Sequence, residues 1–307
     1  MQKVIDKKNT IVIICGPTAV GKTAIATQLA QHFNTKIISA DSRQCFKELN
    51  IGVAKPSIKE LNEVPHFFIN SHSIQEEVNA ITFEKYALEK ATNIFGENTI
   101  AIMVGGTGLY IKAFCEGLDN IPNIPENIRT FITEQYTTHG LVWLQQQVQE
   151  KDAAFWQSAE QKNPHRLIRA LEVIEATGKS INTFRRGEQV QRPFNIIKIG
   201  LQLPRENLYQ QINDRVDAMI NTGLVDEVKS LMPYQQLNAL QTVGYKEIFN
   251  YLNDIYSLPQ AIEEIKKNTR HYAKRQMTWF KKDVSIKWFA PNDNNEMISF
   301  LNEKSFQ

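Results

Sequence analysis

The stretch Ile11-Val12-Ile13-Ile14-Cys15-Gly16-Pro17-Thr18-Ala19-Val20-Gly21-Lys22-Thr23 determines the fold class of this chain. An apolar run leads into the pattern G-x-x-x-x-G-K-[ST], and a helical pattern follows over 22–33. A strand, a glycine-rich turn and a helix in this order form a phosphate-binding loop, whose N–H groups face an anion. Lys22 adds a positive charge, and the Thr23 hydroxyl can hold Mg²⁺. We therefore expect residues 16–23 to bind a di- or triphosphate group.

Strand and helix patterns alternate around this loop. Strands are expected over 11–15, 36–39, 66–69 and 100–104, and helices over 22–33, 82–95 and 107–116. Short apolar strands between helices predict an α/β fold, here a P-loop NTPase-like core with a parallel sheet flanked by helices.

The alternation of expected strands and helices ends at the proline-rich connector 121–125. Helices alone are expected over 126–138, 140–150, 151–159 and 164–177, before strands at 195–203 and 286–289 and helices at 205–222, 224–232, 244–253 and 258–282. We therefore expect a small all-helical insertion domain over 121–181, and a catalytic core made of 1–120 and 182–307.

The composition bounds the class of protein. The chain has 307 residues, of which 42% are hydrophobic and 22% charged, and its net charge of +2 does not by itself imply a nucleic-acid partner. No apolar run approaches the ~18 residues of a membrane span, and the polar N-terminus predicts no signal peptide. Cys15, Cys45 and Cys115 lack the spacing of a zinc site. We expect a cytoplasmic protein, by default a monomer.

Two further strand ends carry polar groups. Asp41 follows the strand over 36–39, in the segment Asp41-Ser42-Arg43-Gln44, at the sheet edge where ligands of open parallel sheets bind. It could accept a proton or cap the following turn, and the residues alone do not separate these roles. Thr107 lies in Gly105-Gly106-Thr107-Gly108, where it could donate its hydroxyl into the crevice or cap the next helix.

Basic side chains stand out in two groups and at one single position. Arg166 and Arg169 share a helix face that suits phosphate contacts, or that pairs with Glu172. Residues 266–282 hold seven Lys and Arg with interleaved aromatics and no acidic residue, a pattern of polyanion binding as well as of a solvated face. Arg215 is a candidate second cation for a diphosphate, or a surface partner of the neighbouring acids Asp214 and Asp217.

Seven motifs occur in the order seen in one family. They are GPTAVGKT (16–23), SADSRQ (39–44), IGVAKP (51–56), VGGTGLY (104–110), HRLIRALEV (165–173), VGYKE (243–247) and AKRQMTWF (273–280). Together they resemble the tRNA dimethylallyltransferases, which prenylate adenosine-37 beside the anticodon. The resemblance covers nearly the whole chain. Two departures are Cys45-Phe46 and Asn70, which stand where the family more often has an apolar-Tyr pair and an Asp.

The resemblance implies a role for each motif. Residues 16–23 would hold dimethylallyl diphosphate, with Mg²⁺ at Thr23, and the catalytic groups would be Asp41, Thr107, Lys22 and Arg215. The tRNA anticodon stem-loop would contact Asp41, Ser42, Arg43, Gln44, Thr107, Arg129, His165, Arg166, Leu167, Ile168, Arg169, Thr242, Val243, Gly244, Tyr245 and Lys246.

Other functions remain open at this point. A P-loop kinase for a small molecule would use the same loop, but leaves the helical insertion and the basic helix unexplained. An RNA-binding module with a vestigial loop conflicts with the intact glycines, Lys22 and Thr23. Prenylation of free adenine nucleotides is a close variant of the tRNA prenylation that the resemblance implies.

Overall fold

The computed structural model describes residues 9–185, 187 and 189–305. The N-terminal residues 1–8, on which the expectation about a signal peptide rests, lie outside this part. Two compact units are present: Met1–Cys115 with Gln191–Gln307, and Glu116–Val190. Among the described residues, no helix is both long enough and apolar enough to cross a membrane.

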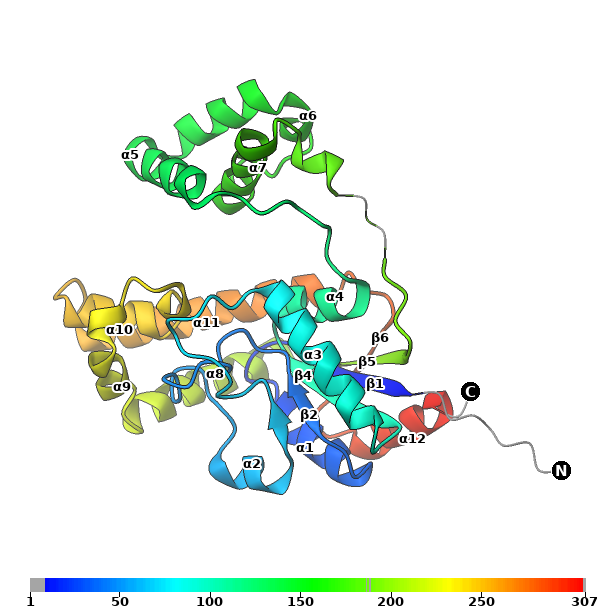
Figure 1. Cartoon of the computed structure of the whole chain (residues 1–307). Coiled ribbons are helices and arrows are strands. Elements are labelled where there is room, and N and C mark those ends of the chain that lie inside the picture. Colours follow the sequence, from blue (N-terminus) through cyan, green and yellow to red (C-terminus); the bar gives the residue numbers. More distant parts are fainter. Residues whose placement is uncertain (1–8, 186, 188, 306–307) are drawn as a thin grey trace. The chain divides into compact units, whose positions relative to one another are not determined.

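A parallel sheet forms the centre of the first unit (Figure 1). Its strands are β1 (Thr10–Cys15), β2 (Ile37–Ser39), β3 (His66–Phe67), β4 (Ile100–Gly105), β5 (Asn195–Leu201) and β6 (Ile286–Phe289), in the order β3-β2-β4-β1-β5-β6. Every pairing of neighbours is parallel, as the sequence predicts. Because β1 has strands on both edges and helices on both faces, its apolar run is continuous and fully buried.

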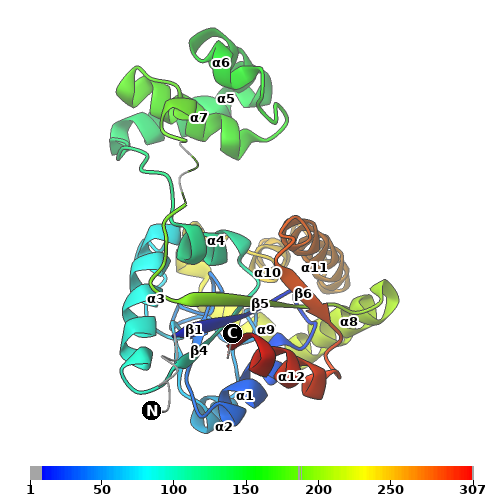
Figure 2. The same ribbon diagram turned by 90° about the vertical axis from the view of Figure 1, so that its right-hand side faces the viewer.

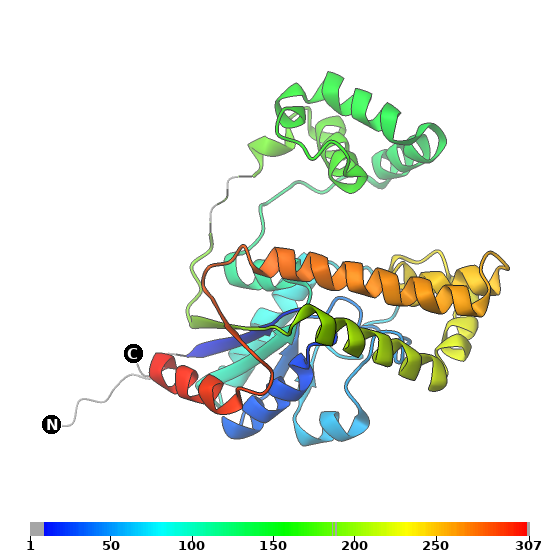
Figure 3. The same cartoon turned by 180° about the vertical axis from the view of Figure 1, so that it is seen from behind.

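Helices cover both faces of this sheet (Figure 2). Helices α1 (Lys22–His32) and α12 (Asn294–Ser305) lie on one face, and α3 (Ala80–Phe95) and α4 (Gly108–Glu116) on the other. The rings of Phe83 on α3 and Tyr110 on α4 stack with centroids 4.6 Å apart. Beside the sheet, α11 (Leu258–Phe280) runs along α8 (Arg205–Asn221), as Figure 3 shows, and packs against α10 (Tyr245–Leu252).

Among the described residues of the second unit, helices and one 3₁₀ turn are the only regular secondary structure. The unit contains α5 (Glu126–Lys151), α6 (Ala153–Trp156) and α7 (Pro164–Thr177), followed by a 3₁₀ turn at Ile181–Thr183. Gly140, with φ 72° and ψ −164°, breaks α5 where the sequence predicts a boundary between two helices. The compact unit spans Glu116–Val190, and the Val190 N–H donates to the Glu116 carbonyl at 2.9 Å where its two connecting segments lie.

Some elements differ from the sequence-based expectation. Strand β3 is shorter than 66–69, because Phe68 and Asn70 turn into the left-handed region with φ of 62° and 53°. Helix α6 is shorter than 151–159, since Asp152 has non-helical angles and caps it through Phe155 N–H. The helices α2 (Ile58–Glu63), started by a capping box at Ser57, and α12 were not expected.

Candidate active site

The phosphate-binding loop connects β1 to α1 in a shape that only particular residues permit. Gly16 has φ 145°, and a Cβ there would lie 2.6 Å from the Leu201 carbonyl oxygen of β5. Gly21 has φ 92° and forms the start of α1. Ala19, with φ 65°, is also left-handed. These backbone angles form a tight turn at the N-terminus of α1, where N–H donors would bind a phosphate group.

Two cations face the cavity beside this loop. Lys22, Thr23 and Arg215 line a cavity of about 430 Å³ together with the ends of β2 and β4. Lys22 Nζ donates to the Pro17 carbonyl at 2.6 Å. Burial, and then the charge of Arg215, lower the pKa of Lys22 to about 8. The charge of Asp41 acts on both cations, so two positive charges share this nearby carboxylate, an arrangement suited to a multivalent anion.

Arg215 points into this site rather than pairing with its neighbours on α8. Asp214 accepts from the Gln210 amide at 2.7 Å, and Asp217 pairs with Lys266 at 2.8 Å. Burial lowers the pKa of Arg215, and the nearby Asp41 opposes this shift. The alternative of a surface ion pair is therefore not what the structure contains.

A buried glutamine of α11 fixes the phosphate-binding loop by hydrogen bonds. Gln276 Oε1 accepts from Thr18 N–H at 2.7 Å, and its Nε2 donates to the Gly106 carbonyl at 2.9 Å. A Cβ on Gly106 would lie 2.2 Å from that Nε2, so any other residue at this position would displace the glutamine amide. The side-chain amide thus joins the phosphate loop to the turn after β4, and both of its ends are used.

Asp41 and Thr107 are held on adjacent turns. Asp41 Oδ1 accepts from the N–H groups of Arg43 at 2.8 Å and Gln44 at 3.3 Å, so the residue does cap the turn. Its Oδ2 has no hydrogen-bond partner among the described residues, and the side chain lines both cavities of the site. Thr107 Oγ1 accepts from Ser42 N–H at 3.1 Å, which ties the turn after β4 to the turn after β2.

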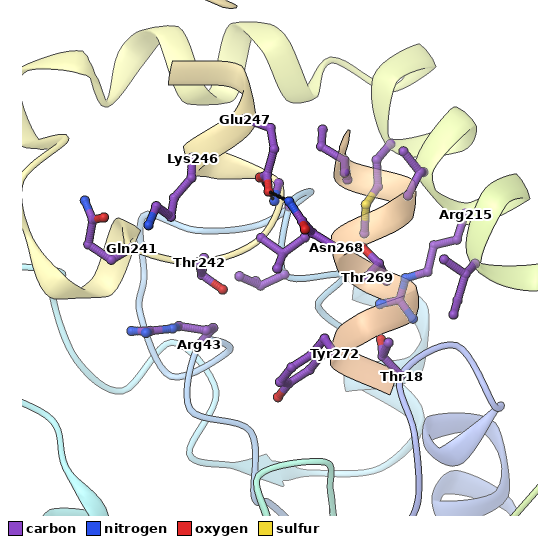
Figure 4. A pocket seen from close by; sticks show the side chains of 18 of the residues that line it. Thr18, Arg43, Arg215, Gln241, Thr242, Lys246, Glu247, Asn268, Thr269 and Tyr272 are labelled. Carbon is purple, nitrogen blue, oxygen red and sulfur yellow. Dashed lines mark hydrogen bonds between the residues drawn. The ribbon is translucent and has the colours of Figure 1, made fainter. Parts of the chain in front are cut away.

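A second cavity, of about 540 Å³, continues from the first. The two share Thr18, Asp41, Val53 and Arg215. Figure 4 shows Arg43, Thr242 and Lys246 around one side of this cavity, with Arg215, Thr18 and Tyr272 around the other. The Tyr272 hydroxyl hydrogen-bonds with Thr107, and burial together with the Asp41 charge raises the pKa of this phenol to about 12. Asp41 therefore lies where the two cavities meet. We call the cavity at the phosphate loop the inner cavity and the second one the outer cavity.

A carboxylate of α9 (Leu224–Ser230) shapes the loop that covers both cavities. Glu227 accepts from the N–H groups of Asn50, Ile51 and Gly52 at 3.1, 2.8 and 3.1 Å. It also accepts from the Tyr245 hydroxyl at 2.6 Å. A Cβ on Gly52 would lie 2.5 Å from the Tyr245 ring. One side chain therefore fixes the segment over 51–56 against the segment over 242–246.

The departures from the family pattern are accommodated. Cys45 and Phe46 are both buried in the core. Lys55 Nζ donates to the Phe46 carbonyl at 2.6 Å and to the Asn70 side-chain oxygen. Burial lowers the pKa of Lys55 to about 8. The neutral amide of Asn70 thus keeps the acceptor for Lys55, without a negative charge.

The structure corrects the predicted contacts of several residues. Leu167 is fully buried in the core of the second unit, and Tyr245 is fully buried behind Gly52, so neither side chain can reach a ligand. The Gln44 amide is occupied by the carbonyls of Val53 and Ala54, at 3.3 and 3.0 Å. The side chains of Leu167 and Tyr245 therefore position neighbours, whereas Gln44 holds the segment over 53–54 and also lines the cavity at the phosphate loop.

The basic residues of the second unit carry internal partners. Arg169 pairs with Glu172 at 2.9 Å, as the alternative reading proposed, and Arg166 pairs with Glu160 at 3.2 Å on the surface. Arg185, which lies over the Phe155 ring at 5.4 Å, was not singled out from the sequence. Burial, and then the charge of Arg166, lower the pKa of Arg185. The two cations therefore lie close enough to interact. His165 is exposed, Ile168 is half-buried, and Arg129 is half-buried on the first turn of α5.

The basic helix α11 is partly neutralised. Lys266 pairs with Asp217 and Lys267 with Glu264, and Arg270 donates to Asn213. In the described part of the chain, four exposed cations in or just after this helix have no ion pair: Lys274, Arg275, Lys281 and Lys282.

The model of the family described as "IPP transferase" matches residues 44–283. The chain belongs to this family. Within it, a tRNA dimethylallyltransferase of Christiangramia forsetii is 47% identical over 290 residues, covering 94% of this chain and 96% of that one. The tRNA dimethylallyltransferase of Cytophaga hutchinsonii is 43% identical, covering 96% and 97%.

Solved structures agree with this assignment. The tRNA isopentenylpyrophosphate transferase of Bacillus halodurans is 34% identical with a TM-score of 0.72, and the match covers 97% of both chains. A eukaryotic dimethylallyltransferase described as acting on tRNA is 27% identical with a TM-score of 0.75, covering 97% of this chain and 79% of that one. The resemblance, the P-loop type of α/β fold and the parallel sheet predicted from the sequence are thereby confirmed.

Proposed function

We propose that this protein transfers a dimethylallyl group from dimethylallyl diphosphate to the N6 amine of adenosine-37 in tRNA, with release of diphosphate. The observation that carries the proposal is the pair of cavities that meet at Asp41, one at the phosphate loop and one at the segment over 241–247. The diphosphate donor would occupy the inner cavity. A tRNA is too large to enter the site as a whole, so it would reach the donor through the outer cavity.

The inner cavity fits the diphosphate. The loop N–H groups, Lys22 and Arg215 would neutralise the charge that develops on the leaving group, where one preorganised donor typically contributes about 10²–10³ in rate. The half-buried Thr23 hydroxyl lines the same cavity and is an oxygen ligand of the kind that Mg²⁺ takes. A bound Mg²⁺ would supply further charge neutralisation at the diphosphate. Since the described residues contain no cluster of three or more His, Cys, Asp or Glu suited to a metal, the ion would rely on Thr23 and on the donor's oxygens.

Asp41 is placed for the acceptor amine. In the proposed step, N6 forms a bond to the allylic carbon, the carbon–oxygen bond of the donor breaks, and the N6 proton passes to the Asp41 carboxylate. Oδ2 is the oxygen for this role, because Oδ1 already accepts two backbone N–H groups. Thr107, fixed by Ser42 N–H, would align the amine. General-base assistance of this type is typically worth about 10²–10⁴ in rate.

The RNA has to present its adenine as an extruded base. An adenine stacked in the anticodon loop cannot reach Asp41, and unstacking costs a few kcal/mol. Contacts from Arg43, Thr242, Val243, Gly244 and Lys246 around the outer cavity would bind the loop. The exposed basic residues of the second unit, His165 and Arg166 among them, and Arg129 with Arg169, would contact the stem.

The test is transfer of label from radioactive dimethylallyl diphosphate, with Mg²⁺, to three acceptors. These are unmodified tRNA with adenosine-37, the same tRNA with guanosine-37, and free AMP. Label on the adenosine-37 tRNA alone is the expected outcome. Label on AMP would indicate a free-nucleotide enzyme, and ATP turnover without transfer of label would indicate a kinase.

A further inference from the structure

One face of α11 continues past the outer cavity. Asn268, Tyr272, Arg275 and Trp279 are spaced by four, three and four residues, which places them on one side of a helix. The first three line the cavity. Trp279 is the next side chain in this row and is 42% exposed. A large aromatic ring thus lies open to solvent just beyond the site.

The ring of Trp279 is held in place by a glycine. A Cβ on Gly108 would lie 2.2 Å from the indole Nε1, so the indole lies directly against this backbone position. Gly108 follows Thr107, whose hydroxyl accepts from Ser42 N–H beside Asp41. The exposed indole therefore packs against the residue that follows Thr107 in the chain. Leu109, next in the chain, is 47% exposed and belongs to the same part of the surface.

The surroundings of Trp279 favour a nucleic acid. Lys274 and Arg275 precede it on α11 and Lys281 and Lys282 follow it, all exposed and without ion pairs in the part of the chain that the structure describes. A stacking aromatic among unpaired cations is the common arrangement of single-stranded nucleic-acid sites. An apolar protein partner would leave these four charges without compensation.

Extrusion of one base creates the ligand for such a ring. When adenosine-37 leaves the stack, each neighbouring base loses a stacking partner on one face. We propose, on the basis of the function above, that Trp279 stacks on one of the bases that flank the extruded adenosine, and so replaces the interaction lost by extrusion.

The experiment is a double-mutant cycle between protein and RNA. Affinities are measured by fluorescence anisotropy without donor, for anticodon stem-loop RNAs that are intact or abasic at position 36 or 38. Trp279→Ala should weaken binding of the intact RNA at least about fivefold, since stacking on one base is worth about 1–3 kcal/mol. Trp279→Phe should retain most of the affinity. One of the two abasic RNAs should bind the wild type and Trp279→Ala equally.

A matched control is available. Tyr234→Ala removes an aromatic ring of similar exposure, 40%, that lies outside the cavity linings, and should leave all affinities unchanged. An equal loss for Trp279→Ala on all three RNAs, or no loss on the intact RNA, would overturn the proposal. Transfer of label to the intact stem-loop by the wild type is measured in parallel. Its failure would count against the proposed function, whereas transfer together with an additive cycle would count against the Trp279 proposal alone.

Discussion

We propose that Asp41 divides two tasks between its two oxygens. Oδ1 caps the turn that carries Arg43 and Gln44, Oδ2 accepts no hydrogen bond from the described residues, and the side chain lines the site. Asp41→Asn retains a carbonyl-type oxygen for the turn and removes the base, so kcat for prenyl transfer should fall by about 10²–10⁴ while tRNA affinity changes little. Single-turnover rates and filter-binding affinities measure the two effects separately.

Asp41→Ala is the comparison for this variant, because it removes the turn cap as well. It should add a loss of stability of about 0.5–2 kcal/mol to the loss of rate. If Asp41→Asn lost tRNA affinity and kept its rate, Asp41 would be a binding residue and not the base.

Lys22 should make donor binding depend on pH. In the free protein its pKa is about 8, because burial and Arg215 disfavour the charged form. A bound diphosphate favours the charged form and raises this pKa, so above about pH 8 binding takes up a proton and affinity falls as the pH rises. Calorimetry with an unreactive dimethylallyl diphosphate analogue, in buffers of different ionisation enthalpy, measures the uptake.

Lys22→Arg keeps a cation that stays charged over this range. Its donor affinity should therefore lose the dependence on pH above about 8. An unchanged dependence in this variant would assign the proton to another group.

At the level of single residues, sequence reasoning located the residues that line the cavities better than the contacts that support them. Lys22 was marked by a motif and Asp41 by a strand end, whereas Arg215 could only be named as a candidate cation on a helix, with a surface ion pair as the alternative. The contacts of Gln276 with Thr18 and Gly106 could not be found, since they join residues far apart in the chain. A buried polar residue within the apolar stripe of a helix was the available signal. Leu167 and Tyr245 were misread as ligand contacts because a motif does not reveal which of its residues are buried.

At the scale of elements, α11 acts on the phosphate loop through one amide. Gln276→Met conserves the shape and removes both hydrogen bonds, which leaves Thr18 N–H and the Gly106 carbonyl without their partner. Such a loss typically costs about 1–3 kcal/mol for each buried group. The variant should be less stable to urea, and its KM for the donor should rise several-fold.

Gln276→Glu distinguishes geometry from packing. It keeps an acceptor for Thr18 N–H but places a carboxylate against the Gly106 carbonyl and near the diphosphate, so its KM for the donor should exceed that of Gln276→Met. Thr278→Ala, an exposed substitution on the same helix, is the control. An unchanged donor KM in both Gln276 variants would limit this residue to a structural role.

Elements with strong periodicity were predicted and those defined by turns were not. The strands β1 and β4 and the helices α1 and α7 follow from apolar patterns that end in glycine or a cap. β3 was predicted too long, because the left-handed angles of Phe68 and Asn70 oppose the apolar pattern of the residues themselves. Tertiary packing decides such cases, and one sequence contains no direct record of it.

At the scale of the whole molecule, charge is distributed between two units with separate cores. If the second unit binds the RNA backbone, removing its cations should reduce the dependence of tRNA affinity on salt. Arg166→Gln combined with Arg169→Gln should shallow the slope of log K against log salt by about 1–2. The donor KM should not change. Glu172→Gln is added so that no buried carboxylate loses its partner Arg169.

Lys179→Gln removes an exposed cation just beyond the end of α7 and serves as the matched control. Its salt slope should equal that of the wild type. A triple variant with an unchanged slope would remove α7 from the RNA interface, while leaving the assignment of the catalytic groups intact.

The hydrogen bond from Thr18 N–H to Gln276 spans 258 residues. Because a chain is synthesised from its N-terminus, the residues of the phosphate loop leave the ribosome long before the residue that fixes their geometry. The central strand β1 likewise waits for β5, its neighbour on one edge. Translation therefore delays completion of this loop until Gln276 has also left the ribosome, and a nascent chain arrested earlier carries the motif without the contact that fixes it.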